Sequence, residues 1–239
     1  MSDPLFLVPV IPAGDTGVLD GPEGHHAADV ARLRTGEALV LADGAGGTAR
    51  AVVTAVAKGR LELRITERSY QAPPDPRLVV VQGIAKGDRG ELAVQAMTEV
   101  GVDAFVPWSA ARSVVQWRSE RGEKARQRWV DTAREAAKQA RRAWVPVVGP
   151  AESTVEVAAR LATGLVLHEE ATTALSTVDL PASGDITVVV GPEGGIAPDE
   201  LAAFVAAGAR VVRLGATVLR TSTAGVAAAA VLSARLGRW

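Results

Sequence analysis

Two glycine-bearing loops near the C-terminus have the residue types and spacing expected of a small-molecule binding site. They are GPEGG at 191–195 and LGATVLRTSTA at 214–224. Loops with so few side chains let a ligand lie directly against backbone N–H and C=O groups. Neither is a Walker phosphate loop, because no Gly-Lys-Ser/Thr follows the glycines, and neither carries the G-x-G-x-x-G of a dinucleotide fold. For GPEGG alone, a tight turn before a proline-started helix is an equally good interpretation.

The segments around these loops predict the elements that must position them. The β-branched run 186–190 indicates a buried strand, and Pro198 followed by two acidic residues indicates the first turn of a helix. A second short apolar run, 211–214, precedes the second loop, and an alanine-rich helix is expected from Gly225 to Leu236. Both loops would then lie at the carboxyl ends of strands, where open α/β sheets bind ligands. The two loops together predict one shared site.

Together the two loops resemble the cofactor loops of the SPOUT methyltransferases, and specifically of the RsmE family, which methylates N3 of a uridine (1498) in 16S ribosomal RNA. The resemblance implies S-adenosylmethionine as cofactor, a homodimer, and an α/β fold with a SPOUT-type trefoil-knotted parallel sheet. Connectivity rules alone would argue against a knot. The cofactor-binding residues that the resemblance implies are Leu167, His168, Glu169, Gly191, Pro192, Glu193, Gly194, Gly195, Leu214, Gly215, Val218, Leu219, Arg220, Thr221, Thr223 and Ala224.

Arg220 is the candidate catalytic residue. Methyl transfer from a sulfonium chiefly requires an aligned nucleophile, and uridine N3 must also lose its proton. A cation near the carbonyl oxygens of the base would favour that anion, so Arg220 is expected to stabilise charge or orient the substrate. The alternative is a structural ion pair with Glu193. Ser222 stands where the family commonly has a glutamate, and Ala197 where it commonly has a Ser or Thr helix cap, so the general base is unassigned.

Composition narrows the class of protein. The chain has 239 residues, 48% hydrophobic and 22% charged, with a formal net charge of -1 and no cysteine. Disulfides, zinc-thiolate sites and cysteine nucleophiles are therefore excluded. The N-terminus lacks the features of a signal peptide, no apolar run is long enough to span a membrane, and a cytoplasmic location is expected. No metal site is expected, because adjacent His25 and His26 would point in different directions on a helix.

A proline-rich stretch divides the chain. The proline-rich stretch predicts a linker at 72–77 between two domains. The resemblance to the same family implies that 1–71 is a PUA-like β-barrel RNA-binding domain and that 78–239 is a SPOUT methyltransferase domain. Short β-like runs at 5–10, 38–41, 49–56 and 61–65 favour the barrel, with one helix at 24–34. In the second domain, strands are expected at 78–81, 104–107 and 165–169. His168 and Glu169 cannot form an acid/base pair, because neighbouring residues on a strand face opposite ways.

The segment from Arg112 to Arg142 is strongly basic, with ten Arg or Lys against four Asp or Glu. On a helix, Trp129, Ala133, Ala136, Ala140 and Trp144 share one face and the basic residues gather opposite. We favour binding of an RNA backbone, because a concentrated basic face is what phosphates require. The alternative is a solvated amphipathic helix, since Asp131 and Glu135 lie within the basic face and neutralise part of it. The expected RNA-binding residues, including two from the first domain, are His25, Arg32, Lys86, Arg112, Arg121, Lys124, Arg128, Lys138 and Arg142.

Two other functions remain open from the sequence. A SPOUT enzyme could methylate a ribose 2′-hydroxyl or another base position. A non-enzymatic RNA-binding assembly factor could use the barrel and the basic helix alone, but it would have no use for the glycine loops.

Overall fold

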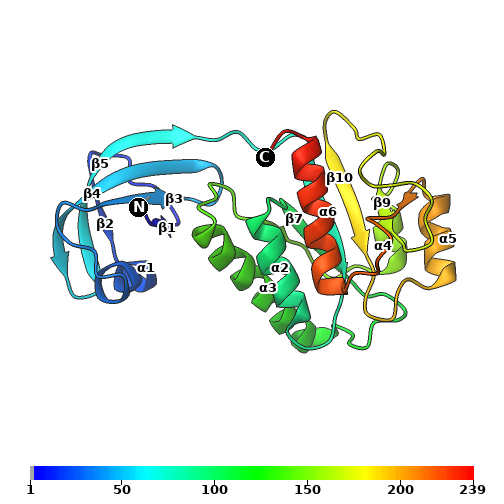
Figure 1. The fold of residues 1–239 in the computed structure, drawn as a ribbon. Helices are drawn as coiled ribbons and strands as arrows, with labels where there is room; N and C mark the ends of the chain where they lie inside the picture. The colour runs from blue at the N-terminus through cyan, green and yellow to red at the C-terminus, as the bar shows by residue number, and fades with distance from the viewer. Residues whose placement is uncertain (1–2) are drawn as a thin grey trace. The chain divides into compact units, whose positions relative to one another are not determined.

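The computed structural model describes residues 3–239, which form two compact units (Figure 1). Unit 1 contains the chain up to Pro73 together with Ala137–Val145, and unit 2 contains Pro74–Ala136 and Pro146–Trp239. The domain boundaries expected around the proline-rich stretch stay a prediction.

Unit 1 is built on a five-stranded sheet with the strand order β1-β3-β4-β5-β2. Strands β1 and β3 are parallel and the other pairs are antiparallel. Its elements are β1 (Leu5–Leu7), β2 (Thr16–Leu19), α1 (Gly21–His25), the π-helix η1 (His26–Val30), β3 (Ala38–Ala42), β4 (Gly47–Ala57) and β5 (Arg60–Tyr70). Between the edge strands β1 and β2, no pairing is recorded within residues 3–239, so the hydrogen bonding leaves the expected barrel open at that seam.

Two local features of unit 1 were not expected. The sequence did not indicate β2, because its Thr-Gly-Val-Leu lacks a clear apolar alternation. The single helix expected at 24–34 is instead a short α-helix that continues as a π-helical turn, closed by the hydrogen bond from Ala31 N–H to His26 O. Arg32, with φ of 56°, then turns the chain out of the helix.

Unit 2 contains a six-stranded parallel sheet with the order β11-β9-β10-β6-β7-β8. The expected parallel sheet is therefore confirmed. Its elements are β6 (Arg77–Gly83), α2 (Arg89–Glu99), β7 (Ala104–Trp108), α3 (Ser119–Gln139, whose last residues belong to unit 1), β8 (Val147–Val148), α4 (Thr154–Ala158), β9 (Leu165–Leu167), β10 (Asp185–Val190), α5 (Pro198–Ala206), β11 (Arg210–Val212) and α6 (Thr221–Arg235). The short elements β8 and α4 were not expected.

Helices cover both faces of this sheet. Alternate residues of β6 point to opposite sides, so Val79 and Val81 pack with Phe204 of α5. Val80 packs on the other side, in a cluster with residues of α2, α3 and α6. Figure 1 shows α6 running beside α2, with α4 and α5 grouped together elsewhere in the same unit. The near-continuous apolar strands that the sequence suggested are explained by this burial on both faces.

The strand order brings distant segments together at one edge. Because all six strands are parallel, their carboxyl ends meet at the same edge of the sheet. Strand β9 lies between β11 and β10, and β10 lies beside β6. The segments that follow these four strands are therefore neighbours, although more than a hundred residues separate β6 from β11 in the chain.

Helix α3 carries the predicted buried face, but it is shorter than the basic segment. Trp129, Ala133 and Ala136 are buried, as expected. Arg112 precedes the helix, whereas Arg142 and Trp144 follow it, so these three do not share its geometry. Within residues 3–239, no helix is long and apolar enough to cross a membrane.

Candidate cofactor and RNA site

The GPEGG loop after β10 lies directly against the end of β6. A Cβ added at Gly83 would lie 2.5 Å from the amide nitrogen of Pro192, so only glycine permits this approach. The loop closes through the hydrogen bond from Gly195 N–H to Pro192 O at 2.9 Å. Gly195 has a φ of 73°, a region that residues with a Cβ rarely adopt. The sequence prediction of a tight glycine turn at a strand end is confirmed.

A buried hydrogen-bond chain locks this loop to the start of α6. The Thr221 hydroxyl donates to the carbonyl oxygen of Gly191 at 2.7 Å and accepts from the side-chain amide of Gln82 at 2.9 Å. Gln82 is fully buried, and its Oε1 has no hydrogen-bond partner in the described part of the chain. Sequence reasoning missed Gln82, although a single polar residue in the apolar run Leu78–Gly83 was a usable signal.

The second glycine loop is open, and its backbone is available to a ligand. Residues 215–220 are exposed, and a Cβ added at Gly215 would have no neighbour within 4 Å. The N–H groups of residues 214–220 have no recorded hydrogen-bond partner within residues 3–239. Free backbone donors and acceptors beside a glycine turn fit a cofactor such as S-adenosylmethionine, which combines an amino acid and a nucleoside. The orphaned Oε1 of Gln82 adds a buried acceptor behind the loops.

The segment after β9 completes the same edge. His168 N–H donates to Val212 O at 3.0 Å, which joins the ends of β9 and β11. The His168 ring nitrogen Nδ1 accepts from Glu170 N–H at 3.3 Å, so the ring is turned toward its own loop, and Glu169 is exposed. Leu167 is half-buried at the strand end. These positions agree with a pocket wall and offer no acid/base pair.

Glu193 is held by residues that follow β6. Its Oε1 accepts from Lys86 N–H at 3.1 Å and from Arg89 Nη1 at 3.4 Å. The alternative of an ion pair between Glu193 and Arg220 was therefore wrong. Arg220 is exposed, and no ion pair is recorded for it in residues 3–239. Its guanidinium is consequently open to a substrate at the start of α6.

Arg112 lies over the first glycine loop. Its Nη1 donates to the carbonyl oxygen of Gly194 at 3.3 Å. A Cβ added at Gly194 would lie 2.9 Å from the carbonyl oxygen of Arg112, so the missing side chain makes room for this arginine. Arg112, predicted as an RNA contact within the basic segment, therefore lies at the first glycine loop, ahead of helix α3.

The remaining candidate RNA contacts divide by exposure. Arg121 and Lys124 on α3 are exposed, and no ion pair is recorded for them in the part of the chain that the structure describes. Arg128 is exposed but paired with Glu91 at 3.0 Å. Lys138 is buried and pairs with Glu23 at 2.9 Å, so it cannot reach a phosphate and we leave it out of the RNA surface.

In unit 1 the His25 ring approaches the Asp29 carboxylate at 2.7 Å, while Arg32 is exposed. Neither His25 nor Arg32 is thereby placed beside other candidate ligand-binding residues in the described part of unit 1. Within residues 3–239, no group of three or more His, Asp or Glu residues is arranged to hold a metal ion.

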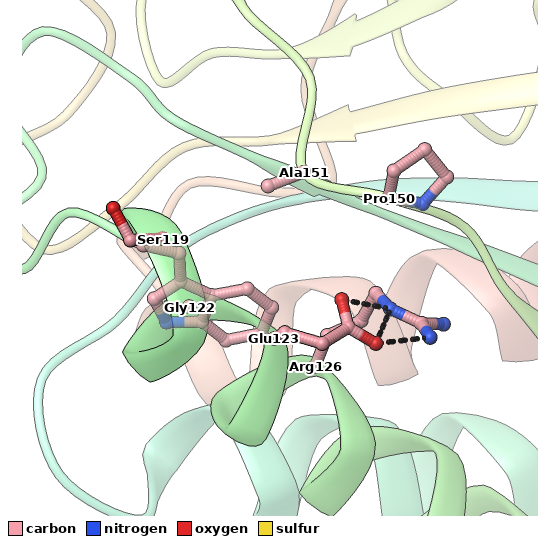
Figure 2. A pocket seen from close by; sticks show the side chains of 7 residues that line it. Ser119, Gly122, Glu123, Arg126, Pro150 and Ala151 are labelled. Atoms are coloured by element: carbon pink, nitrogen blue, oxygen red, sulfur yellow. Dashed lines mark hydrogen bonds and ion pairs between the residues drawn. The ribbon is translucent and has the colours of Figure 1, made fainter.

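A pocket of about 160 Å³ lies where the start of α3 faces the segment after β8 (Figure 2). There Arg126 Nη2 lies 2.6 Å from Glu123 Oε1, and Arg126 Nη1 also donates to Val148 O at 3.0 Å. The hydrogen-bonded Arg126 lowers the pKa of Glu123. The charged groups that line the pocket, Glu123 and Arg126, therefore already satisfy each other's hydrogen bonds. The lining residues are Trp117, Ser119, Gly122, Glu123, Arg126, Pro150 and Ala151.

Comparison with known proteins gives a consistent result. Residues 73–233 match the family described as RNA methyltransferase domain, and residues 19–66 match the RNA methyltransferase PUA domain. Ribosomal RNA small subunit methyltransferase E of Mycobacterium bovis is 48% identical over 98% of this chain and 93% of its own length. The protein of that name from Bacillus subtilis is 30% identical over 90% of this chain and 88% of its own.

Solved structures agree in fold over the full length. The crystal structure of ribosomal RNA small subunit methyltransferase E from Neisseria gonorrhoeae, bound to S-adenosyl methionine, superposes with a TM-score of 0.86 at 29% identity, covering 98% of both chains. A putative methyltransferase from Legionella pneumophila in complex with the same cofactor gives a TM-score of 0.83 at 27% identity, covering 98% of this chain and 97% of its own. By its matched domain, its identity to these relatives and its fold, the chain belongs to the RsmE family of ribosomal RNA small subunit methyltransferases.

Proposed function

We propose that this protein transfers the methyl group of S-adenosylmethionine to N3 of uridine 1498 in 16S ribosomal RNA. The observation that carries the proposal is the meeting of two glycine loops at one edge of the parallel sheet, one locked by Thr221 and the other open to a ligand. Relatives at 48% and 30% identity carry the matching name, and a relative of the same fold holds the cofactor.

The two loops and the end of β9 would hold the cofactor. GPEGG would contribute its backbone and the shape set by Gly195, while residues 214–219 would contribute N–H and C=O groups that bond nothing else in the described chain. Leu167, Leu214 and Leu219 offer partly exposed apolar surface for the adenine ring. S-adenosylmethionine supplies an electrophilic methyl group whose departure leaves a neutral thioether, so alignment is the main requirement.

Arg220 is the residue we assign to the charge that develops on the uracil ring. Loss of the N3 proton leaves negative charge on the two flanking carbonyl oxygens, which an open guanidinium can stabilise. Arg220 is exposed and unpaired within the described chain, at the junction of the second loop and α6. Ser222 beside it cannot act as a carboxylate base, so the protein would stabilise the uracil anion rather than supply a strong base.

RNA would approach along the exposed basic residues near this edge. Arg112, Arg121 and Lys124 present guanidinium and ammonium groups to solvent in unit 2, and Arg128 shares its charge with Glu91. The PUA domain match supports RNA contact by unit 1, with His25 and Arg32 as candidate contacts. Backbone contacts of this kind position a nucleic acid without reading its sequence. Selection of one uridine would therefore come from the shape of the RNA.

Three further properties follow from family membership and stay proposals for this chain. They are a homodimer, a cytoplasmic location and a trefoil knot in the sheet of unit 2. The return of the chain from the edge strand β11 to α6, which packs against α2, β6 and β10, supports the knot.

The decisive experiment locates the methyl group. Purified protein and labelled S-adenosylmethionine are incubated with naked 16S RNA and with small ribosomal subunits from cells that lack the modification. Nuclease digestion and mass spectrometry should then find N3-methyluridine at one position. A label on a ribose 2′-hydroxyl or on another base would support the alternative SPOUT activity.

Variants of Arg220 sharpen that assay. Arg220→Gln should lower kcat by about a hundredfold, in the range for loss of one charge-stabilising donor, with little change in cofactor affinity. Arg220→Lys keeps the charge and should lose less. An Arg220→Gln enzyme with wild-type kcat would remove Arg220 from the mechanism. Failure of the wild-type protein to bind the cofactor at all would revive the non-enzymatic RNA-binding factor.

A further inference from the structure

Glu200 is a buried carboxylate that receives hydrogen bonds from three separate segments. It is the third residue of α5, with 4% of its surface exposed. Its Oε1 accepts from Ala111 N–H at 2.8 Å and from the Thr154 hydroxyl at 2.8 Å, and its Oε2 accepts from Ala197 N–H at 3.1 Å. No ion pair of Glu200 is recorded within residues 3–239. A buried charge without a cation is costly and needs a reason.

The local network favours a carboxylate at this position. The Thr154 oxygen accepts a hydrogen bond from Trp108 Nε1 at 3.2 Å, so its own hydrogen is directed to Glu200. All three partners of Glu200 are then donors, and a carboxylate is an acceptor-only group. A glutamine would have to turn its NH₂ toward one of the three.

Helix capping alone does not explain the burial of Glu200. At the start of α4, Glu156 accepts from Ser153 N–H at 2.8 Å in a capping box and remains exposed. The same stabilisation of a helix start is thus obtained at the surface. Glu200 differs from Glu156 in that it also accepts hydrogen bonds from outside its own helix start, from Thr154 and from Ala111 in the segment that follows β7.

Ala111 immediately precedes the arginine that covers the cofactor loop. The Arg112 carbonyl and Cβ lie against Gly194, and Arg112 Nη1 donates to Gly194 O at 3.3 Å. Arg112 itself is exposed, so its other guanidinium N–H groups face solvent. Glu200 therefore holds one end of a short segment whose other end brings a cation to the rim of the GPEGG loop.

We propose that Glu200 is a positioning residue that acts through Arg112, holding the Arg112 guanidinium where it binds an acceptor oxygen of the substrate RNA. The inference rests on the proposed methyl transfer to RNA. The inference adds to that function a substrate contact, which Arg112 makes at the cofactor loop. The buried carboxylate of Glu200 holds that contact in place. Sequence reasoning missed Glu200, which looked like an ordinary acidic residue in the first turn of a helix.

A double-mutant cycle tests the dependence of Glu200 on Arg112. Glu200→Met keeps the side-chain volume and removes both acceptors, and it is combined with Arg112→Ala. Each single variant should lower kcat/KM for RNA roughly tenfold, within the range of coupling seen in one hydrogen-bond network. In the Arg112→Ala background, Glu200→Met should have little further effect. Cofactor affinity, measured by calorimetry, should stay within about twofold of wild type.

Additive losses would overturn the proposal, because Glu200 would then act independently of Arg112. A parallel fall in cofactor affinity would also overturn it, since Glu200 would then serve the cofactor loop through Ala197. Glu200→Gln, which retains one carbonyl acceptor, should give an intermediate loss. Glu156→Gln, the matched change in an exposed capping box, should leave kcat/KM for RNA unchanged.

A second pair of variants covers the case in which Glu200→Met does not fold. Thr154→Val removes one of the three donors at similar volume, whereas Thr154→Ser keeps the hydroxyl. Thr154→Val should lower kcat/KM for RNA, as Glu200→Met does. Thr154→Ser should keep kcat/KM for RNA near the wild-type value. Equal kcat/KM for RNA in the two Thr154 variants would contradict the proposal.

One measurement separates this inference from the proposed function. Hydrogen exchange of the Ala111 amide should be slow in the wild-type protein and faster in the Glu200→Met or Thr154→Val variant, whatever the protein does to RNA. If the wild-type protein methylates no RNA, the proposed function fails. The double-mutant cycle of Glu200 and Arg112 is then measured by RNA binding affinity in place of kcat/KM. Unchanged Ala111 exchange in an active enzyme overturns the positioning role alone.

Discussion

The side chains of Gln82 and Thr221, 139 residues apart in the chain, share a buried hydrogen bond of 2.9 Å. Thr221 also donates to the carbonyl oxygen of Gly191 at 2.7 Å, so one hydroxyl joins the end of β6, the loop after β10 and the first residue of α6. A threonine in this position can be both donor and acceptor. The two glycine loops are thereby fixed relative to each other before any cofactor binds.

Removal of that hydroxyl should loosen both loops. In Thr221→Val, the Gln82 amide keeps only its longer hydrogen bond to Gly83 O, and the Gly191 carbonyl loses the Thr221 hydroxyl in a buried environment. The change should cost about 1–3 kcal/mol of unfolding free energy. Cofactor affinity should fall with it. Denaturant unfolding and calorimetry measure the two effects, and Thr221→Ser, which keeps the hydroxyl, is the matched control. A Thr221→Val protein with wild-type stability and affinity would show that the hydrogen-bond chain is dispensable.

The two loop glycines should respond differently to an added methyl group. In Gly194→Ala the Cβ would lie 2.9 Å from the Arg112 carbonyl oxygen, so the segment carrying Arg112 must shift, at a cost of about 1–3 kcal/mol for overpacking. In Gly215→Ala the Cβ meets nothing within 4 Å, and stability should be unchanged. Thermal unfolding separates these cases.

The cofactor affinities of Gly194→Ala and Gly215→Ala then show how closely the cofactor approaches each glycine. A loss of affinity in the stable Gly215→Ala protein would indicate contact between the added methyl group and the cofactor, because the Cβ meets no protein atom within 4 Å. Wild-type affinity in Gly194→Ala would contradict the dependence of the GPEGG loop on glycine at that position.

Exposed basic residues of α3 should supply part of the salt dependence of RNA binding. Arg121→Ala and Lys124→Ala should each weaken binding of any RNA and reduce the slope of log affinity against log salt concentration by about 1. Arg128→Glu should act in the same direction, although its pairing with Glu91 reduces the charge that it offers. Filter binding at several salt concentrations measures the slopes.

Arg77→Ala is the control for that series. Arg77 lies at the amino end of β6, where it pairs with Asp185 at 2.8 Å, away from the carboxyl edge of the sheet. Its loss should leave the salt slope unchanged. A slope reduced as much by Arg77→Ala as by Lys124→Ala would show that binding follows overall charge rather than the proposed surface.

The Glu123–Arg126 pair should give a small acid-dependent contribution to stability. Hydrogen bonding by Arg126 lowers the pKa of Glu123, so the folded protein binds its proton less readily than the unfolded chain. The contribution is complete above the usual glutamate pKa of about 4.3 and is lost as pH falls through the lower, folded value. Glu123→Gln should therefore be less stable than wild type at neutral pH and equal to it in strong acid.

Denaturant unfolding from about pH 7 to about pH 3 checks this convergence. Because Glu123 is exposed, the difference at neutral pH should be small. Glu120→Gln, which removes a neighbouring exposed carboxylate at the start of α3, is the control for charge alone. A stability difference between wild type and Glu123→Gln that persists unchanged in acid would contradict the assignment to this pair.

Much of unit 2 could be predicted because its local signals agree with its tertiary environment. The run 186–190 is β-branched and apolar, and β10 is buried on both faces as such a run requires. Proline at the first position of α5 and the glycines before it mark a strand-to-helix turn, and the structure has one there. The short elements β8 and α4 escaped prediction, because two residues and five residues establish no clear period.

The sequence by itself determined that two glycine loops follow strands, that α3 has a buried face, and, through the pair of loops, which family the chain belongs to. These are properties of neighbouring residues, so they survive without knowledge of the fold. Only the tertiary structure decided that Gln82, Thr221 and Gly191 meet, that Arg112 covers Gly194, and that Lys138 is buried against Glu23. Such contacts depend on strand order and packing between segments far apart in the chain, about which periodicity carries no information.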